Sequence, residues 1–93
     1  MIGMASKKVL NGKLVTVLID YHDMIRKIRI SGDFFIHPEE SINEIEEFLV
    51  GLDVRLEKEV IEYKLRNFIR MRDIKLIGFD EEDLTNVIKE AVK

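Results

Sequence analysis

The sequence predicts an α+β fold, in which a small antiparallel sheet formed by an N-terminal hairpin or meander packs against about three helices. Apolar residues alternate in the first third of the chain and then recur about every 3.6 positions, which indicates strands followed by helices. A second observation is Asn11-Gly12 between two apolar runs, since Asn-Gly favours the left-handed dihedrals of a tight hairpin turn. Because 93 residues correspond to one domain, we expect a single domain over residues 1–93.

Two strands flank this turn, at Lys7–Leu10 and Lys13–Asp20. The second strand has the stronger pattern, because alternate apolar side chains share one face: Val15, Val17 and Ile19. Met1–Ser6 shows neither periodicity nor a capping residue, so we expect this end of the chain to be frayed.

A polar break at Tyr21–Asp23 allows the chain to reverse into a third strand, Met24–Ser31. Alternation divides its side chains between two faces, with Ile28 and Ile30 on one and Ile25, Lys27 and Arg29 on the other. Gly32-Asp33 then forms a turn. Phe34–Ile36 is a further short strand, because aromatic and β-branched residues pack well on a pleated surface.

Two helices are expected next. The first begins at Pro38, which suits the first helical turn, and ends before Gly51, a common residue just past a helix end. The second covers about Val54–Arg70, is capped by Asp53, and carries an exposed Glu62–Arg66 pair. Their buried stripes comprise Ile42, Ile45, Phe48 and Leu49 in the first helix, and Leu56, Val60, Ile61, Leu65, Phe68 and Ile69 in the second.

The segment Ile74–Phe79 leaves two interpretations open, a short strand or an extended connector that ends at Gly78. Asp80, with Asp83 three residues later, resembles a capping box and predicts the start of the last helix. The buried face of that helix repeats at helical spacing and comprises Leu84, Val87, Ile88 and Ala91.

Residues for catalysis or metal binding form no recognisable site in this sequence. The chain has no cysteine, which excludes disulfides, thiolate zinc sites and thiol nucleophiles. His22 and His37 are the only imidazoles, and their spacing on different turns is not that of metal ligands. The serines lack a nucleophile-elbow motif, and no glycine-rich run precedes a helix to hold the phosphates of ATP. We therefore predict no catalytic residue, no metal and no cofactor bound by this chain.

The charge and hydropathy of the chain argue against two further classes of partner. A net charge of -3 and a pI near 5.4 argue against nucleic-acid binding, because phosphate backbones attract basic surfaces. Apolar runs are short and broken by charge, which indicates neither a membrane span nor a secretory signal. The sequence thus predicts a cytoplasmic protein with no nucleic-acid and no membrane partner.

One stretch has a distinctive layout, in which a strand ends at Gly32-Asp33-Phe34-Phe35 and Pro38-Glu39-Glu40 follows. With its flanking motifs, the chain resembles the C-terminal accessory domain of lipoate-protein ligases, including the free-standing small subunit of archaeal two-component enzymes. The resemblance covers about Gly12 to Val92. Its other motifs are Gly12-Lys13-Leu14, the isoleucine-rich stretch Ile25–Ile30, Ile45-Glu46, Leu49-Val50-Gly51, and Gly78 before Asp80–Asp83.

This resemblance implies a non-catalytic accessory subunit. In the family, the catalytic domain binds lipoate and ATP, forms lipoyl adenylate, and passes the lipoyl group to a lysine of an acceptor lipoyl domain. The accessory domain is needed for the activation step, so lipoate and ATP are expected on a catalytic partner. This chain contains neither the glycine-rich segment nor the lysine of the catalytic domain.

The resemblance also directs attention to an interface with the catalytic subunit, comprising Gly32, Asp33, Phe34, Phe35, Pro38 and Glu39. Because Phe34 and Phe35 alternate across a strand, at most one points into the core of this domain. Burial of Phe35 under a helix and an interface role both remain open. We expect Asp33 to brace the turn after Gly32 rather than to contact the partner.

Two alternative functions remain. One is a generic protein-interaction domain whose partner is unrelated to lipoate. The other is a weak nucleic-acid-binding module that uses the basic strand residues Arg26, Lys27 and Arg29 with nearby aromatics. A stand-alone enzyme is the least supported class.

Overall fold

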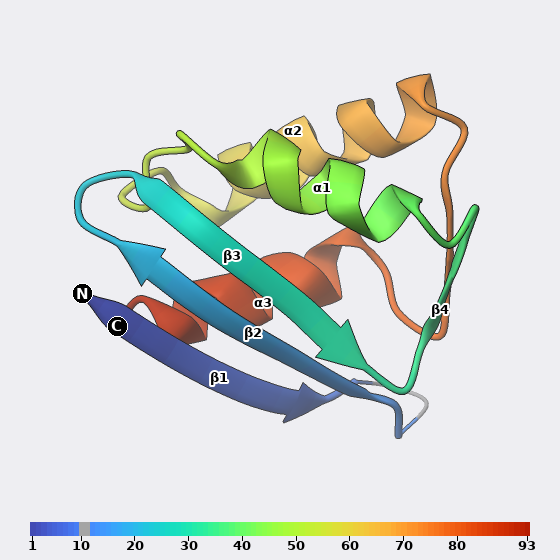
Figure 1. The fold of residues 1–93 in the computed structure, drawn as a ribbon, viewed down its shortest axis with the longest axis horizontal. Coiled ribbons are helices and arrows are strands. Elements are labelled where there is room, and N and C mark those ends of the chain that lie inside the picture. The colour runs from blue at the N-terminus through green and yellow to red at the C-terminus, as the bar shows by residue number, and fades with distance from the viewer. Residues whose placement is uncertain (10–11) are drawn as a thin grey trace.

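The structure is a computed structural model that describes residues 1–9 and 12–93. Its elements form a three-stranded antiparallel sheet in the order β1-β2-β3, a separate antiparallel pair β4-β5, and three helices among the described residues (Figure 1). The elements are β1 (Ile2–Lys8), β2 (Leu14–Tyr21), β3 (Ile25–Gly32), β4 (Phe35–His37), α1 (Ser41–Leu49), α2 (Lys58–Met71), β5 (Lys75–Ile77) and α3 (Glu81–Ala91). The predicted α+β fold is confirmed.

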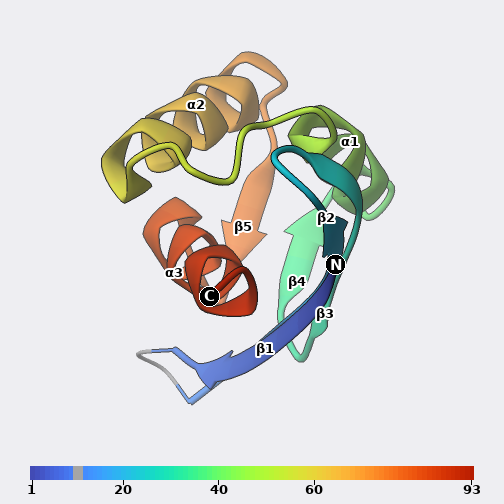
Figure 2. The ribbon, with the colours of Figure 1, turned by 90° about the vertical axis from the view of Figure 1, so that its left-hand side faces the viewer.

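The core lies between one face of the three-stranded sheet and the helices. Figure 2 shows the curved sheet on one side and the three helices on the other. α1 packs on β3, while α3 packs on β1, β2 and α2. Alternate residues of β2 supply the centre of this core, as predicted: Val15, Val17 and Ile19, together with Tyr21. Tyr21 is thus the last residue of the strand and not the start of a polar break.

The N-terminal segment is a strand, so the prediction of a frayed end at Met1–Ser6 is wrong. β1 pairs with β2 from Ile2↔Asp20 to Lys8↔Leu14 and begins five residues before the predicted Lys7. Its half-buried residues are Gly3 and Ala5, whereas the larger Ile2 and Met4 are exposed. Because the residues of β1 that face the core are small, the sequence shows no apolar periodicity here. This is why the strand was not predicted.

Only part of the predicted hairpin turn can be compared with the structure, since Leu10 and Asn11 lie outside the described residues. Gly12 has φ 76°, the left-handed backbone that favours glycine. Its N–H donates to the carbonyl of Val9 at 2.8 Å.

A β-bulge changes the predicted faces of β3. Asp20 pairs with Lys27, whereas the next residue, Tyr21, pairs with Ile25, so Arg26 is an extra residue on β3. The bulge brings Ile25 to the core side, where it is buried together with Ile28 and Ile30. The prediction that Ile25 lies on the outer face is therefore wrong, because strict alternation assumes an uninterrupted ladder.

The first two helices begin later than predicted. Pro38 lies in a turn whose carbonyl accepts from the Ser41 N–H at 3.0 Å, and α1 begins at Ser41. α2 begins at Lys58 rather than Val54, since the Asp53 carboxylate does not cap a helix. It binds the backbone N–H and the guanidinium of Arg55. Local hydrogen bonds of this kind favour a turn over a helix start.

The later predictions agree more closely with the structure. The predicted i,i+4 pair on α2 forms, with Arg66 Nη2 2.6 Å from Glu62 Oε2, and it is partly buried rather than exposed. The ambiguous segment contains β5, which pairs with β4. Asp80 and Asp83 form the predicted capping box of α3, and its predicted inward residues are buried: Leu84, Val87, Ile88 and Ala91.

Candidate partner-docking groove

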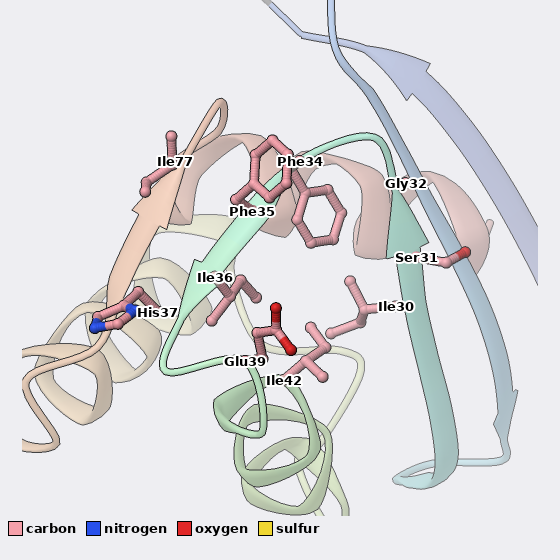
Figure 3. Close-up of a pocket in the computed structure, with 10 residues that line it drawn as sticks. All are labelled: Ile30, Ser31, Gly32, Phe34, Phe35, Ile36, His37, Glu39, Ile42 and Ile77. Atoms are coloured by element: carbon pink, nitrogen blue, oxygen red, sulfur yellow. The ribbon is translucent and has the colours of Figure 1, made fainter.

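A surface groove of about 540 Å³ lies between the end of β3 and strand β4 (Figure 3). Figure 3 shows β4 between β5 on one side and β3 on the other, with the groove on the β3 side. Its lining residues are Ile30, Ser31, Gly32, Phe34, Phe35, Ile36, His37, Glu39, Ile42 and Ile77. Four of the six predicted interface residues are therefore brought together here, namely Gly32, Phe34, Phe35 and Glu39.

The floor of the groove is apolar. Ile30 from β3 and Ile36 from β4 are buried core residues, and Ile42 from α1 is partly buried (Figure 3). The three side chains come from three different elements that meet where the β3 edge ends. A ligand side chain placed here would contact apolar carbon on several sides, which favours an aliphatic or aromatic group.

The two adjacent phenylalanines have different environments. The Phe34 ring packs on Phe79, with ring centroids 4.2 Å apart and an interplanar angle of 39°. Phe35 is 68% exposed and sits opposite Ile77, which is 53% exposed. The cross-strand pair Phe35–Ile77 therefore presents an apolar rim to solvent, and the interpretation that buries Phe35 under a helix is excluded.

Gly32 and Asp33 shape the end of the groove. A Cβ on Gly32 would lie 2.0 Å from the Leu14 carbonyl oxygen and 2.8 Å from the Phe34 ring, so the close approach requires glycine. Asp33 Oδ1 accepts from the Leu14 N–H, and the Asp33 N–H donates to the Leu14 carbonyl at 3.2 Å. Asp33 thus braces the turn against β2, as expected, and does not line the groove.

Polar groups are few at the groove. Glu39 and His37 are exposed at its rim, and Figure 3 shows the Glu39 carboxylate directed toward the groove beside Ile42. Glu39 forms no ion pair with any described residue. Pro38 is exposed but lies outside the groove lining. A cation brought by a partner would find a carboxylate here without an intramolecular competitor.

Sequence reasoning missed several lining residues. Ile42, predicted on the buried stripe of the first helix, and Ile30, predicted beside Ile28 on one face of the third strand, form part of the groove floor. Ile77 lies in the segment whose interpretation was open, so its pairing with Phe35 was hidden. One signal could have indicated Ile77. It is an aliphatic residue in a short apolar run that ends just before the capping box, so it cannot belong to the buried face of the helix that follows.

A second exposed apolar surface lies on the outer face of the three-stranded sheet. It contains Ile2, Met4 and Leu18 and is bordered by Lys27 and Arg29. Leu18 pairs with Met4 on one side and with Arg29 on the other. Among the described residues, those that line the hollow on this face include no aromatic side chain on which a base of single-stranded nucleic acid could stack.

The described residues offer little for other chemistry. No group of three or more His, Cys, Asp and Glu side chains within them is arranged to hold a metal ion. Burial raises the pKa of Asp83 at the start of α3, and hydrogen bonds from Arg55 lower that of Asp53, both outside the groove. No helix in this part of the chain has the length and apolar content needed to cross a bilayer.

Comparisons with known proteins identify similar chains among solved structures and among curated proteins. A structure of an archaeal lipoylation system, a bi-partite lipoate protein ligase and its E2 lipoyl domain from Thermoplasma acidophilum, contains a chain with a TM-score of 0.74 and 33% sequence identity, over 95% of this chain and 97% of that chain. Lipoate-protein ligase A subunit 2 of Thermoplasma acidophilum is 41% identical over 49 residues, which span 52% of this chain and 52% of that protein. No model of a known protein family matches.

Proposed function

This chain belongs to the family of accessory subunits of lipoate-protein ligases, and we propose that it is the non-catalytic subunit of a two-component enzyme. In this proposal the catalytic subunit binds lipoate and ATP and forms lipoyl adenylate. It then transfers the lipoyl group to a lysine of an acceptor lipoyl domain. The chain described here is required for the activation step. Because the complex consumes ATP, we place it in the cytoplasm.

The observation that carries this proposal is the similarity over nearly the whole chain. The related chain from the bi-partite ligase matches 95% of this chain with a TM-score of 0.74. A match over nearly the whole chain implies that the binding surfaces built on its strands and helices can be retained. The aligned stretch of the curated relative is only about half its length, so the activity of that protein enters here as part of the proposal.

We place contact with the catalytic subunit at the groove between β3 and β4. The exposed pair Phe35–Ile77, the apolar floor and the single carboxylate of Glu39 support this placement. Interface centres are depleted in charge and enriched in aromatic side chains, and a large exposed aromatic group beside a pocket is a common anchor.

An accessory subunit without chemistry of its own acts through binding energy. It favours one conformation of its partner only if it binds that conformation more tightly than the other. A preference of about 100-fold, roughly 2.7 kcal/mol, converts a partner that is 10% competent into one that is more than 90% competent. The groove must then contact a segment of the catalytic subunit that moves between the two conformations.

The direct test mixes this chain with a purified catalytic subunit, ATP, lipoate and an acceptor domain, and measures lipoyl adenylate with and without the chain. The proposal expects adenylate only when both subunits are present. Transfer of chemically prepared lipoyl adenylate to the acceptor should depend less on the chain. Equal adenylation by the catalytic subunit alone, together with no complex on a sizing column, would contradict the proposal.

A further inference from the structure

We propose that the catalytic subunit binds the groove by strand addition, with an extended segment inserted between the free edges of β3 and β4. The segment carries an apolar side chain for the groove floor and a lysine or arginine for Glu39. This inference rests on the proposed function and adds the mode of binding and the chemistry of the bound segment.

The β3 edge has backbone groups that point into the groove. β3 is an edge strand, paired only with β2 in its sheet. The Ile30 N–H donates to Glu46 of α1 at 2.8 Å and therefore points away from β2. The Asp33 N–H donates to the Leu14 carbonyl and therefore points toward β2. Backbone groups of successive residues alternate between these two directions in an antiparallel ladder. The backbone N–H and C=O of Gly32 consequently point away from β2 as well, toward the groove that this residue lines.

The opposite wall of the groove is also a strand edge. β4 pairs with β5 through Phe35↔Ile77 and His37↔Lys75, so its other side faces β3 (Figure 3). Neighbouring strands lie about 4.8 Å apart, so one strand between two edges satisfies backbone groups on both of its sides. An inserted segment would join the two sheets of this chain into one. Strand addition of this kind supplies affinity through the backbone, and side-chain pockets supply specificity.

The side chains around the groove define what the segment carries. The floor of Ile30, Ile36 and Ile42 requires an apolar group, because a polar group there would lose its water without a hydrogen-bond partner. The unpaired Glu39 carboxylate at the rim favours a basic residue nearby. Successive residues of a strand point to opposite faces, and every second residue points to the same face. We therefore expect the basic residue either next to the apolar residue or two positions from it.

Glu46 limits where the added strand can begin. Its carboxylate occupies the Ile30 N–H, which an added strand would otherwise use. The backbone of Gly32 is therefore the first free position at the groove end of β3. Replacing Glu46 by Ala frees the Ile30 N–H, and we expect the Glu46→Ala variant to bind the catalytic subunit about three- to tenfold more tightly, the gain of about one hydrogen bond.

Amide hydrogen exchange tests the inference. The ¹⁵N-labelled chain is saturated with purified unlabelled catalytic subunit, and exchange at Gly32 is compared with exchange at Met4. Met4 is a matched control, because its N–H points away from β2 at the opposite edge of the sheet, as the Met1–Tyr21 backbone pair indicates. We expect at least about tenfold slower exchange at Gly32 in the complex and no change at Met4.

The other outcomes separate the two proposals. If the complex forms and Gly32 exchanges as fast as in the free chain, strand addition is wrong and the accessory function is unaffected. Protection of Met4 instead of Gly32 would place the partner on the β1 edge and also overturn the inference. If no complex forms, the proposed function itself fails, and strand addition with it.

A pair of charge variants tests the basic residue in the segment. Glu39→Lys should weaken binding at least about tenfold, with a larger effect at low salt, since repulsion then replaces attraction. Glu59→Lys on α2 is the matched control, because Glu59 is exposed, forms no ion pair with the described residues and lies outside the groove. Equal effects of the two variants would show that Glu39 contributes only to the overall charge, which overturns this part of the inference.

Discussion

Phe34 and Phe35 show how a single peptide bond separates a residue that stabilises the fold from one that is available to a partner. Phe34 is partly buried against the core and its ring packs on Phe79. Phe35, one position later, points to the other side of the chain and is exposed. Burial of a large aromatic side chain contributes free energy of folding, so an exposed one contributes mainly when another molecule covers it.

Replacing Phe35 by Ala should therefore change binding and leave stability almost unchanged. We expect a change of less than about 0.5 kcal/mol in the free energy of unfolding, and at least about tenfold weaker binding of the catalytic subunit. Urea unfolding and titration calorimetry measure the two quantities. Tyr63→Ala is a control of similar exposure on α2, expected to alter neither. Unchanged affinity for Phe35→Ala would remove Phe35 from the interface.

Phe34→Ala should show the opposite pattern. Loss of the packing against Phe79 should lower the free energy of unfolding by roughly 1–3 kcal/mol, less than for a fully buried phenylalanine. Circular dichroism at increasing temperature measures this loss. A melting temperature equal to that of the unmodified chain would show that the ring pair contributes nothing to folding.

The sequence pointed to those residues of the candidate site that belong to a sequence motif, and it gave no indication of the others. The sequence singled out Gly32, Phe34, Phe35 and Glu39, which the fold brings to one groove. The sequence could not show which of Phe34 and Phe35 faces the core, because alternation along a strand indicates only that their side chains point to opposite sides. Ile77 was hidden, since its role arises from pairing with Phe35, which lies 42 positions earlier in the chain, and no local pattern encodes that pairing.

Asp53 gives the chain a specific response to acid. The side-chain hydrogen bond from Arg55, its backbone hydrogen bond and its charge lower the pKa of Asp53 from 3.8 to about 2. Because the folded state has the lower pKa, ionised Asp53 stabilises the fold above pH 3.8, and this contribution is lost as the pH falls toward 2.

The Asp53→Asn variant should therefore lose less stability than the unmodified chain between about pH 4 and pH 2. Urea midpoints across this range for the two chains measure the difference. Parallel pH profiles would show that the ion pair with Arg55 does not form in solution.

At the scale of elements, β1 depends on a glycine, Gly3, close to its start. A Cβ on Gly3 would lie 1.8 Å from the carbonyl oxygen of Ala91, so α3 approaches β1 closely because this position lacks a side chain. Tertiary contact, rather than β-propensity, holds the strand in place. The other errors of element prediction have different causes that periodicity does not encode either: a shift of register at Arg26, and local hydrogen bonds between Asp53 and Arg55 before α2.

Gly3→Ala should force β1 and α3 apart. Overpacking of this kind costs roughly 1–3 kcal/mol, which corresponds to a fall of about 4–8 °C in melting temperature for each kcal/mol. Scanning calorimetry measures the shift. Met4→Ala on the exposed side of the same strand should change the melting temperature little. A melting temperature for Gly3→Ala equal to that of Met4→Ala would contradict the close packing.

At the scale of the whole molecule, the division into two sheets creates the groove. The sequence predicted a small sheet with helices, and it could not show that β4 leaves β3 to pair with β5, because that partner lies beyond two helices. Apolar surface remains open both at the groove and on the outer face of the three-stranded sheet. A chain of this size buries only about 60–65% of its unfolded surface, so covering more of it should add appreciable stability.

The melting temperature of this chain should therefore rise with the concentration of the catalytic subunit. A partner at about 100 times its dissociation constant adds roughly 2.7 kcal/mol, enough for a shift of about 10 °C or more. Fluorescence-detected melting of a labelled chain at increasing partner concentration measures the rise, and the Phe35→Ala variant should require more partner for the same shift. A constant melting temperature would mean that the folded chain does not bind.

The two ends of the chain lie at the same end of the molecule in Figure 1, where β1 and α3 contact each other. β4 and the end of β3, which line the groove, lie at the other end of the molecule in Figure 1, and the longest extent of the molecule is 30 Å. Affinity tags, dyes or a tethered protein can thus be attached at either terminus without blocking the groove. A peptide tether that carries a ligand from a terminus to the groove must span most of that length, which takes at least about nine extended residues. Closing the neighbouring ends with a short loop and opening the chain elsewhere would give a circular permutant with the same groove.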